Sequence, residues 1–380
     1  PASGGCNMRI SASGKSRILF SQLCEREHTA RSRSFSMTDL SETSFAFADS
    51  RLPRVVVAVT ARERGLFFAQ EAMPPAILLE DADFEPTRWE ACLERERPDV
   101  VVSGWSTPPI PERWLMRPDC PLRYVCHVAG SVRALVPRSF VERGGLVTNW
   151  GDSVSAQVAE HALLLALAAL RHADRWPGFI ARDAAVRRIE EIGTRTLFGR
   201  SVGIHGFGAV ARALLPLLAP FDVKVSAFSL GVPRELMRDA GVKPCESLRE
   251  LFESSEVFFE CEALTPATER SVSAEMIAAL PDDAVFVNVG RGHLVDDRAL
   301  QREARSGRLR LALDVVADEP LTGDSPFVAS GNAILSPHIG GPTLDRYRRC
   351  GQVALANLAS FLRGETPASA ITLAAYDRAT

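Results

Sequence analysis

The sequence predicts an α/β protein that contains two doubly wound parallel sheets. Three observations lead to this prediction. The chain has 380 residues, 46% of them apolar, which is enough for two cores. Short β-branched runs alternate with helical segments along most of the chain, as in sheets covered by helices on both faces. One such run is followed by a glycine turn, G-F-G at residues 206–208, which opens a helix.

The predicted strands are short apolar runs, as expected for parallel strands buried on both faces. The first half of the chain has four of them, at residues 55–59, 100–103, 124–128 and 146–148. The second half has six, at residues 202–205, 223–228, 257–261, 284–289, 309–313 and 333–335. Helices are predicted at residues 86–95, 153–172, 209–218, 273–280, 297–306 and 343–362. The helix at 153–172 is apolar on nearly every face, so we expect it to be buried between domains or between subunits.

Charge and cysteine content argue against several classes of protein. A net charge of −3 does not indicate a nucleic-acid partner. The longest apolar stretch, residues 162–170, is far shorter than the about 20 residues of a membrane span. The eight cysteines show no C-x-x-C pair and no ligand-like spacing, so we expect free thiols, no metal site and a cytoplasmic protein.

Residues 1–53 differ from the rest of the chain. The stretch that ends at Ser36 holds six basic residues against two acidic ones and has no sustained apolar period. We therefore expect residues 1–53 to be disordered or a non-native extension, with Met37 as the natural start. The alternative is an organellar transit peptide, which also has an Arg- and Ser-rich, acid-poor start.

The glycine turn has the composition of a dinucleotide-binding turn. Gly206 allows the tight turn, Gly208 lets the backbone approach a pyrophosphate, and Ala211 is small enough for close helix–strand packing. The helix that starts with Ala209 and Val210 presents unpaired N–H groups and a positive dipole end to the phosphates. We therefore predict that a dinucleotide cofactor binds at this turn.

Three polar segments follow predicted strands further along the chain. They read N-V-G-R-G-H-L-V-D-D (288–297), L-D-V-V-A-D-E-P (313–320) and S-P-H-I-G-G (336–341). Ligands of open α/β sheets bind outside the carboxyl ends of the strands, so these segments are candidates for the functional site.

These segments resemble the signature segments of the D-2-hydroxyacid dehydrogenase family, which read N-x-x-R-G-x-x-V-D, D-V-x-x-x-E-P and P-H-I-G. The stretch L-T-P-A-T (264–268) resembles a further loop of that family, and V-A-E (158–160) resembles the start of its interdomain helix. The similarity covers roughly residues 54–365, in the same order along the chain.

The resemblance implies a Rossmann cofactor domain inserted into a flavodoxin-like substrate domain. The cofactor domain would comprise residues 157–340, and the substrate domain residues 54–156 and 341–380. The active site would lie in the cleft, and hydride transfer would take place between NAD or NADP and a small 2-oxo or 2-hydroxy acid. The partner would be this small molecule and a second copy of the chain, with neither nucleic acid nor membrane.

The family's catalytic arginine, glutamate and histidine match Arg291, Glu319 and His338. The match implies that Arg291 holds the substrate carboxylate and polarises the keto oxygen. His338 would be the general acid in reduction and the base in oxidation, with Glu319 beside it to raise the histidine pKa.

Further residues are expected at the cofactor and the substrate. The cofactor site would also include the residues at strand ends and in the last loop, namely Val289, Gly290, Asp314 and Gly340. The substrate loop would be Ala129, Gly130 and Ser131, which follow a predicted strand and would offer backbone N–H groups to the substrate carboxylate. Trp105 and Trp150 either line the pocket or pack in the core.

The chain departs from the family pattern around the second strand of the cofactor domain. An NAD site has an acidic residue about twenty positions after the turn, whereas Ser229 stands there in this chain. Arg234 follows within reach of a 2′-phosphate, so NAD and NADP remain equal alternatives. Cys261 and Glu262 replace a histidine and a small or apolar residue, and we expect Glu262 near the nicotinamide.

Two histidines outside the signature segments have structural interpretations. His205, at the end of the strand before the turn, is interpreted as a hydrogen-bonded packing residue, and His161 as buried in the long helix. Two functional alternatives stay open. One is a dinucleotide-sensing, non-catalytic corepressor on the same fold, and the other is a dehydrogenase for an unusual biosynthetic substrate.

Overall fold

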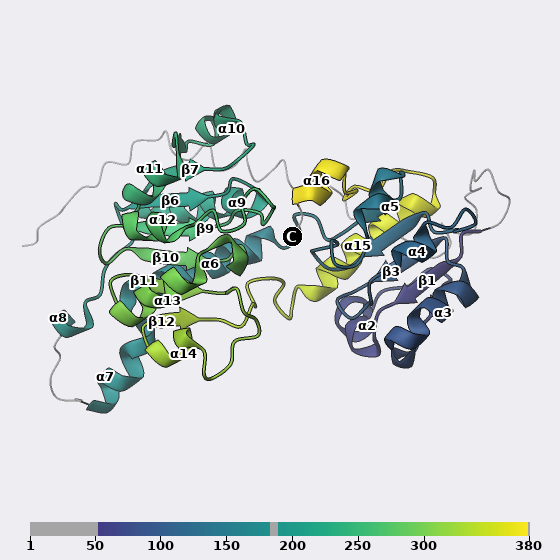
Figure 1. Ribbon diagram of the computed structural model, residues 1–380, viewed down its shortest axis with the longest axis horizontal. Helices are drawn as coiled ribbons and strands as arrows, with labels where there is room; N and C mark the ends of the chain where they lie inside the picture. Colours follow the sequence, from purple (N-terminus) through teal and green to yellow (C-terminus); the bar gives the residue numbers. More distant parts are fainter. Residues whose placement is uncertain (1–51, 183–188, 379–380) are drawn as a thin grey trace, which may run out of the picture. The chain divides into compact units, whose positions relative to one another are not determined.

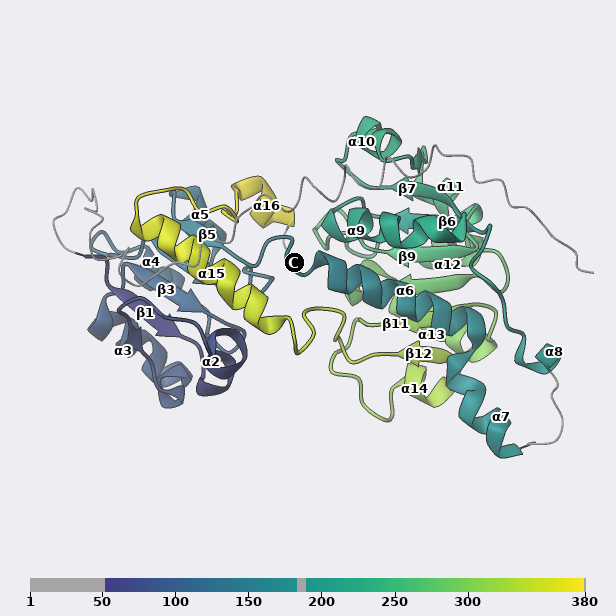
Figure 2. The same cartoon turned by 180° about the vertical axis from the view of Figure 1, so that it is seen from behind.

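A computed structural model describes residues 52–182 and 189–378 of the chain. The predictions for residues 1–36 and for the start at Met37 lie outside the described residues. The described chain forms two parallel sheets, and each has helices on both faces (Figures 1 and 2). The predicted α/β fold class with two doubly wound sheets is therefore confirmed.

The first sheet has the strand order β2-β1-β3-β4-β5, with all pairs parallel. Its strands are β1 (Val55–Ala58), β2 (Ile77–Leu78), β3 (Val100–Ser103), β4 (Tyr124–His127) and β5 (Leu146–Thr148). This order is the flavodoxin-like one. The sequence prediction lacked β2, because a strand of two residues leaves no apolar run to detect.

Helices from both halves of the chain cover the first sheet. One face carries α3 (Pro86–Glu96), α4 (Glu112–Leu115), α5 (Arg138–Glu142) and α16 (Leu373–Arg378). The other face carries α2 (Ala61–Phe68) and α15 (Tyr347–Leu362). A Cβ atom at Gly351 would lie 1.9 Å from the carbonyl oxygen of Phe67, so glycine lets α15 pack directly against α2. The helix predicted from residue 343 begins at Tyr347.

The second sheet has the order β12-β11-β10-β9-β6-β7-β8, again with all pairs parallel. Its strands are β6 (Ser201–His205), β7 (Lys224–Phe228), β8 (Lys243–Pro244), β9 (Val257–Glu260), β10 (Val285–Asn288), β11 (Arg310–Leu313) and β12 (Ala333–Leu335). The chain reverses its direction of winding between β6 and β9, where open sheets bind their ligands. The prediction of six strands was wrong, because β8 is short and lacks β-branched residues.

The two faces of the second sheet have separate cores. One face carries α6 (Ser155–Arg171), α9 (Ala209–Leu218) and α10 (Arg234–Asp239), with α6 and α9 in front of the sheet in Figure 2. The other face carries α11 (Leu248–Glu253), α12 (Ala274–Ala279), α13 (Asp297–Ser306) and α14 (Pro326–Ser330). Two short helices, α7 (Trp176–Arg182) and α8 (Ile189–Ile192), follow α6 along the chain.

The long helix α6 is buried along one side only. Ala162, Leu165, Ala166 and Ala169 pack into the core beneath it, whereas Leu164 is 59% exposed. The expected burial of this helix between domains or between subunits stays a prediction. Because α6 packs against α9 and against β10, β11 and β12, it forms part of the support of the candidate site.

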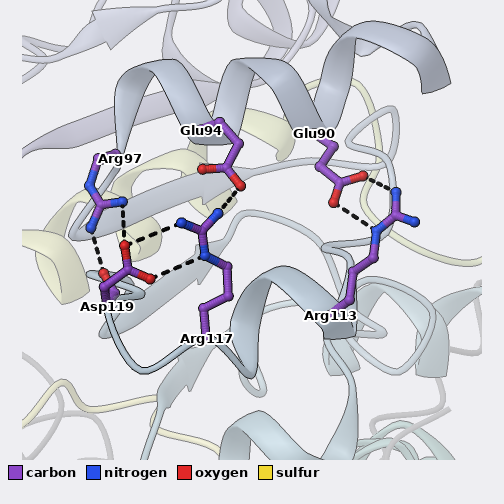
Figure 3. A network of polar contacts seen from close by, with 6 residues as sticks. All are labelled: Glu90, Glu94, Arg97, Arg113, Arg117 and Asp119. Carbon is purple, nitrogen blue, oxygen red and sulfur yellow. Dashed lines mark hydrogen bonds and ion pairs between the residues drawn. The ribbon is translucent and has the colours of Figure 1, made fainter.

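Charged side chains link α3 to the segment that follows it on the surface of the first sheet's domain (Figure 3). Nε of Arg113 donates to Glu90 at 2.7 Å, and Arg117 pairs with Glu94. Asp119 accepts from Arg97 at 3.0 Å and from Arg117 at 3.1 Å. These side chains lie at the surface, where solvent screens their charges, so the pairs contribute little to the free energy of unfolding.

Two further observations concern the described residues only. No helix among them combines the length and the apolar character needed to cross a lipid bilayer. The six described cysteines, at positions 92, 120, 126, 245, 261 and 350, are free thiols.

Candidate active site

The glycine turn follows β6 directly and leads into α9. Gly206 has φ +89°, and a Cβ atom there would lie 2.6 Å from the Cα atom of Glu262. Glycine therefore permits both the left-handed turn and the close approach of the loop after β9. A Cβ atom at Gly208, the N-cap of α9, would meet nothing within 4 Å, so the space beside it is open. Ala211 is fully buried between α9 and the sheet.

A carboxylate lies beside Ser229, where the sequence showed none. Oγ of Ser229 donates to Oε2 of Glu262 at 2.7 Å, although the two residues follow different strands. Ser229 follows β7 and Glu262 follows β9, and these strands lie on either side of β6. This contact places Glu262 at the end of β7, whereas the sequence prediction placed it near the nicotinamide.

A buried pair lies directly below the turn. Nδ1 of His205 lies 2.7 Å from Oε2 of Glu260, and neither side chain is exposed by more than 1%. Burial lowers the pKa of His205, whereas the neighbouring Glu260 carboxylate raises it. The effect of the carboxylate is the larger one, so the pKa lies above its ordinary value. Nε2 of His205 is buried without a hydrogen-bond partner. His205 is thus a packing histidine that also compensates a buried carboxylate.

Arg291 lies in the loop between β10 and the short helix η5 (Gly292–Leu294). Asn288 closes this loop, because its side chain donates to the Arg291 carbonyl at 3.2 Å and accepts from the Gly290 N–H at 3.0 Å. Burial lowers the pKa of Arg291, and the charge of Glu319 opposes this shift. A guanidinium remains protonated at every pH at which proteins are folded, so Arg291 is a permanent cation.

The loops that carry Arg291 and Glu319 touch each other. A Cβ atom at Gly292 would lie 1.9 Å from the carbonyl carbon of Val316, so only glycine fits between the two backbones. The N–H of Val316 in turn donates to Oε1 of Glu319 at 3.1 Å. This contact places the glutamate close enough to Arg291 for its charge to act on the guanidinium.

His338 and Glu319 are in direct contact. Nδ1 of His338 lies 2.7 Å from Oε2 of Glu319, and the histidine side chain is 49% exposed. His338 has φ +54°, a left-handed conformation that costs a non-glycine residue about 1–2 kcal/mol. Because the Glu319 carboxylate accepts a hydrogen bond from the Nδ1–H, the opposite nitrogen, Nε2, is the one that can exchange a proton with a ligand.

Asp314 holds the loop that carries His338. Its carboxylate accepts from the N–H groups of Ile339 and Gly340, both at 2.9 Å, and from Oγ of Ser336 at 2.6 Å. Burial raises the pKa of Asp314, but these bonds and the contact with His161 lower it more, to about 2. A Cβ atom at Gly340 would lie 2.8 Å from the Asp314 carboxylate, so glycine is required there for this contact. The cofactor contacts expected of Asp314 and Gly340 stay predictions.

His161 connects the long helix to the same loop. Its Nε2 atom lies 2.8 Å from Oγ of Ser336 and 3.3 Å from Oδ1 of Asp314. The side chain is 15% exposed, so the interpretation of His161 as a buried residue of the helix was incomplete.

The expected substrate loop follows β4 in the first sheet. A Cβ atom at Gly130 would lie 2.6 Å from the ring of Trp150, so glycine is required for packing against this indole. The carbonyl oxygens of Ala129 and Gly130 accept bonds from the Trp150 N–H and the Asn149 amide. Trp105 is 50% exposed and lies edge-on to Trp150, with 6.2 Å between the ring centroids. The substrate role of residues 129–131 stays a prediction.

Sequence reasoning placed Arg291, Glu319 and His338 together at one edge of one sheet, and it missed the residues that support them. Asn288 stands in the N-x-x-R-G segment, but no supporting role was predicted for it, and Ser336 and Glu260 carry no family signal of their own. The detectable signal was the carboxylate at the end of the apolar strand V-F-F-E, because a buried charge requires a partner. Among the residues that the structure describes, no group of three His, Cys, Asp or Glu side chains gathers as metal ligands would.

The second sheet matches a known family. Residues 163–340 match the family described as D-isomer specific 2-hydroxyacid dehydrogenase, NAD binding domain. The chain is 29% identical to a D-3-phosphoglycerate dehydrogenase of Methanocaldococcus jannaschii over 234 residues, which are 61% of this chain and 44% of that protein. It is 27% identical to a glyoxylate reductase of Korarchaeum cryptofilum, over 83% of this chain and 94% of that protein.

Solved structures show the same fold. The TT0316 protein from Thermus thermophilus aligns with a TM-score of 0.68 and 27% identity, over 84% of this chain and all of that one. The relatives named here are a dehydrogenase and a reductase, which gives no support to the corepressor alternative.

Proposed function

This chain belongs to the D-isomer specific 2-hydroxyacid dehydrogenase family, and from that premise we propose that it interconverts a small 2-oxo acid and its D-2-hydroxy acid with NAD(H) or NADP(H). The observation that carries the proposal is the contact of His338 with Glu319, at the same end of the sheet as Arg291 and the glycine turn. A general acid, a carboxylate partner and a fixed cation are what carbonyl reduction requires of a protein.

The residues around the turn fit a dinucleotide. The open space beside Gly208 and the N-terminus of α9 suit a pyrophosphate, because they combine free approach to the backbone with a positive helix end. The proposed contacts to the cofactor come from Gly206, Gly208, Ala209, Val210, Ser229, Val289, Gly290, Asp314 and Gly340. When bound, the nicotinamide ring supplies or accepts the hydride.

Arg291 has the role of binding the substrate. Its planar guanidinium can pair with the two oxygens of a carboxylate and can stabilise the charge that develops on the keto oxygen. The bonds of Asn288 to the loop on both sides of Arg291 fix the backbone from which this side chain projects. In the first sheet, we assign the substrate carboxylate additional contacts with the N–H groups of Ala129, Gly130 and Ser131.

His338 moves the proton. In reduction, Nε2 would donate a proton to the forming hydroxyl, and in oxidation it would remove this proton. Glu319 accepts a hydrogen bond from the Nδ1–H, which fixes the tautomer and the ring orientation, and its negative charge balances that of the imidazolium. The bonds of Asp314 to the loop hold His338 in its left-handed conformation.

The test is the change in nicotinamide absorbance when the purified chain is mixed with glyoxylate, hydroxypyruvate or pyruvate and either reduced cofactor. We expect oxidation of the cofactor and formation of the D-hydroxy acid. The variant His338→Asn should lose this activity, whereas His172→Asn, at the end of α6, should keep it. The two substitutions are matched, because both histidines have positive φ and asparagine tolerates that conformation.

Absence of turnover with both cofactors and all three acids would overturn the proposal. Equal loss of activity in the two variants would remove the assigned role of His338. A homodimer and a cytoplasmic location stay predictions from the sequence.

A further inference from the structure

We propose that Glu262, together with Ser229, binds the hydroxyls of the adenosine ribose and makes this protein select NAD(H) over NADP(H). The inference rests on the proposed function, because it concerns the same dinucleotide site. It assigns to the loop after β9 the carboxylate that an NAD site ordinarily carries at the end of its second strand, here β7.

The strand register brings the two residues to one place. His205, the last residue of β6, pairs with Phe228 of β7 on one side and with Glu260 of β9 on the other. Ser229 directly follows Phe228, and Glu262 lies two residues beyond Glu260. Both residues therefore flank the start of the glycine turn, where the backbone of Glu262 packs directly against Gly206. The ribose next to the pyrophosphate would meet the 2.7 Å contact between Ser229 and Glu262.

The Glu262 carboxylate is held in place but still has acceptor capacity. Its Oε1 atom accepts from the N–H of Ala263 at 2.9 Å, and its Oε2 atom accepts from Ser229. An ionised carboxylate has about four lone-pair sites, so about two remain for ribose hydroxyls. Ser229 is 9% exposed, and its hydroxyl oxygen can accept a further bond.

The buried pair beneath the turn positions Glu262. Oε1 of Glu260 accepts from the backbone N–H of Glu262 at 2.9 Å, while Oε2 of Glu260 contacts His205. This chain of contacts runs from β6 through β9 to the end of β7. His205 balances the charge of Glu260, and Glu260 fixes the backbone of the residue that carries the selecting carboxylate. His205 and Glu260 are thus positioning residues for the cofactor site.

Two cations in this part of the sheet pair with other carboxylates. Arg234, which the sequence placed within reach of a 2′-phosphate, pairs with Glu246, and Lys243 of β8 pairs with Glu250 at 3.1 Å. A 2′-phosphate needs a nearby arginine or lysine, whereas a ribose diol needs an acceptor. A carboxylate beside Ser229 would repel the phosphate and accept bonds from the diol, so charge and hydrogen bonding both favour NAD(H).

The test is direct binding of NADH and NADPH to the full chain by calorimetry, without substrate. We expect NADH to bind at least tenfold more tightly than NADPH. Glu262→Gln should reduce the ratio of the two Kd values at least fivefold, chiefly by improving the binding of NADPH. Glu253→Gln, an exposed carboxylate on α11 in the same domain, should leave the ratio unchanged.

Glu260→Gln tests the positioning role, because it removes the buried charge without touching the ribose site. We expect it to reduce the NADH/NADPH ratio in a protein whose circular dichroism spectrum is unchanged. If the spectrum shows that this variant does not fold, Ser229→Ala provides the second measurement and should weaken NADH binding with little effect on NADPH.

The inference is overturned if NADPH binds as tightly as NADH, or if folded Glu262→Gln keeps the original ratio. These outcomes differ from a failure of the proposed function. Selective NADH binding without any turnover would support the inference and contradict the enzyme activity. Turnover with a preference for NADPH would contradict only the inference, and absence of binding of both dinucleotides would overturn both.

Discussion

Nδ1 of His338 lies 2.7 Å from Oε2 of Glu319, and the two residues come from the loops after the neighbouring strands β12 and β11. The contact depends on a chain of supports. The Asp314 carboxylate accepts hydrogen bonds from the N–H groups of the two residues that follow His338. The N–H of Val316 donates to Oε1 of Glu319. The histidine therefore presents one ring nitrogen outward while the other is fixed.

The first prediction concerns this pair. His338→Asn should lower kcat/KM by about 10²- to 10⁴-fold, the usual contribution of a general acid or base. Glu319→Gln should lower kcat/KM less, because the glutamine oxygen still accepts a hydrogen bond from the Nδ1–H but the charge that stabilises the imidazolium is lost. Steady-state kinetics of both variants show whether His338→Asn loses more kcat/KM than Glu319→Gln. A Glu319→Gln enzyme with wild-type kcat/KM would contradict the assigned partnership.

The second prediction concerns Arg291. Arg291→Lys should lower kcat/KM for the 2-oxo acid by about 10²-fold or more, because an ammonium cannot form the two parallel bonds of a guanidinium. The Kd of the dinucleotide should stay within about threefold, since Arg291 is assigned to the substrate. Arg298→Lys, an exposed arginine on α13, is the matched control. An unchanged kcat/KM in Arg291→Lys would show that the guanidinium does not bind the substrate.

The third prediction concerns Asp314, whose pKa is lowered to about 2 in the folded protein. An unfolded aspartate titrates near pH 4, so Asp314 stabilises the fold above that pH, and this stability is lost as the pH falls towards 2. The difference between the folded and the unfolded pKa of Asp314 corresponds to a stabilisation of about 2 kcal/mol. Asp314→Asn should lower the free energy of unfolding at pH 7 by about 1–3 kcal/mol, because an amide cannot accept all the bonds of the carboxylate.

Urea unfolding at pH 7 and at pH 3 measures both effects of Asp314. The control is Asp282→Asn, whose carboxylate is 88% exposed. In the Asp314→Asn variant, kcat should also fall, because the His338 loop loses its anchor. Equal unfolding free energies for the two variants would show that Asp314 does not hold this loop.

The fourth prediction concerns His127 of β4, which is 3% exposed and has Nδ1 3.0 Å from Oγ of Ser103. Burial lowers the pKa of His127 to about 4, whereas an unfolded histidine titrates near pH 6.5. The neutral histidine thus supports the fold above pH 6.5, and this stability is lost as the pH falls from about 6.5 to 4. The loss amounts to about 3 kcal/mol.

Free energies of unfolding measured at several pH values between 7 and 4 show how steeply the stability falls with decreasing pH. The variant His127→Gln has no titrating group at this position and should show a shallower decline. His293→Gln, an exposed histidine after β10, should follow the original slope. If His127→Gln and the unsubstituted chain decline in parallel, His127 does not titrate as its burial requires.

Several features could be predicted from the sequence because they depend on local order. Apolar runs marked the longer strands, the glycine turn lay between a strand and a helix, and Arg291, Glu319 and His338 each followed a strand. In a parallel sheet all carboxyl ends meet at one edge, so residues that follow strands converge whatever the strand order is. The strands β2 and β8 escaped detection because two residues do not make a periodic pattern.

Other features were decided only by the tertiary structure. Glu262 and Ser229 are 33 residues apart and touch because crossover connections place β9 and β7 on either side of β6. The pairing of His205 with Glu260 depends on the same strand order and on a register that brings two buried side chains to one face of the sheet.

The sequence by itself thus determined which residues lie at the carboxyl edge of each strand and which chemical groups they carry. The tertiary structure decided which of those groups meet. The physical reason is that strand order and register are set by the packing of distant helices on both faces of the sheet, and a carboxylate acquires its role from the partner that this packing brings within hydrogen-bonding distance.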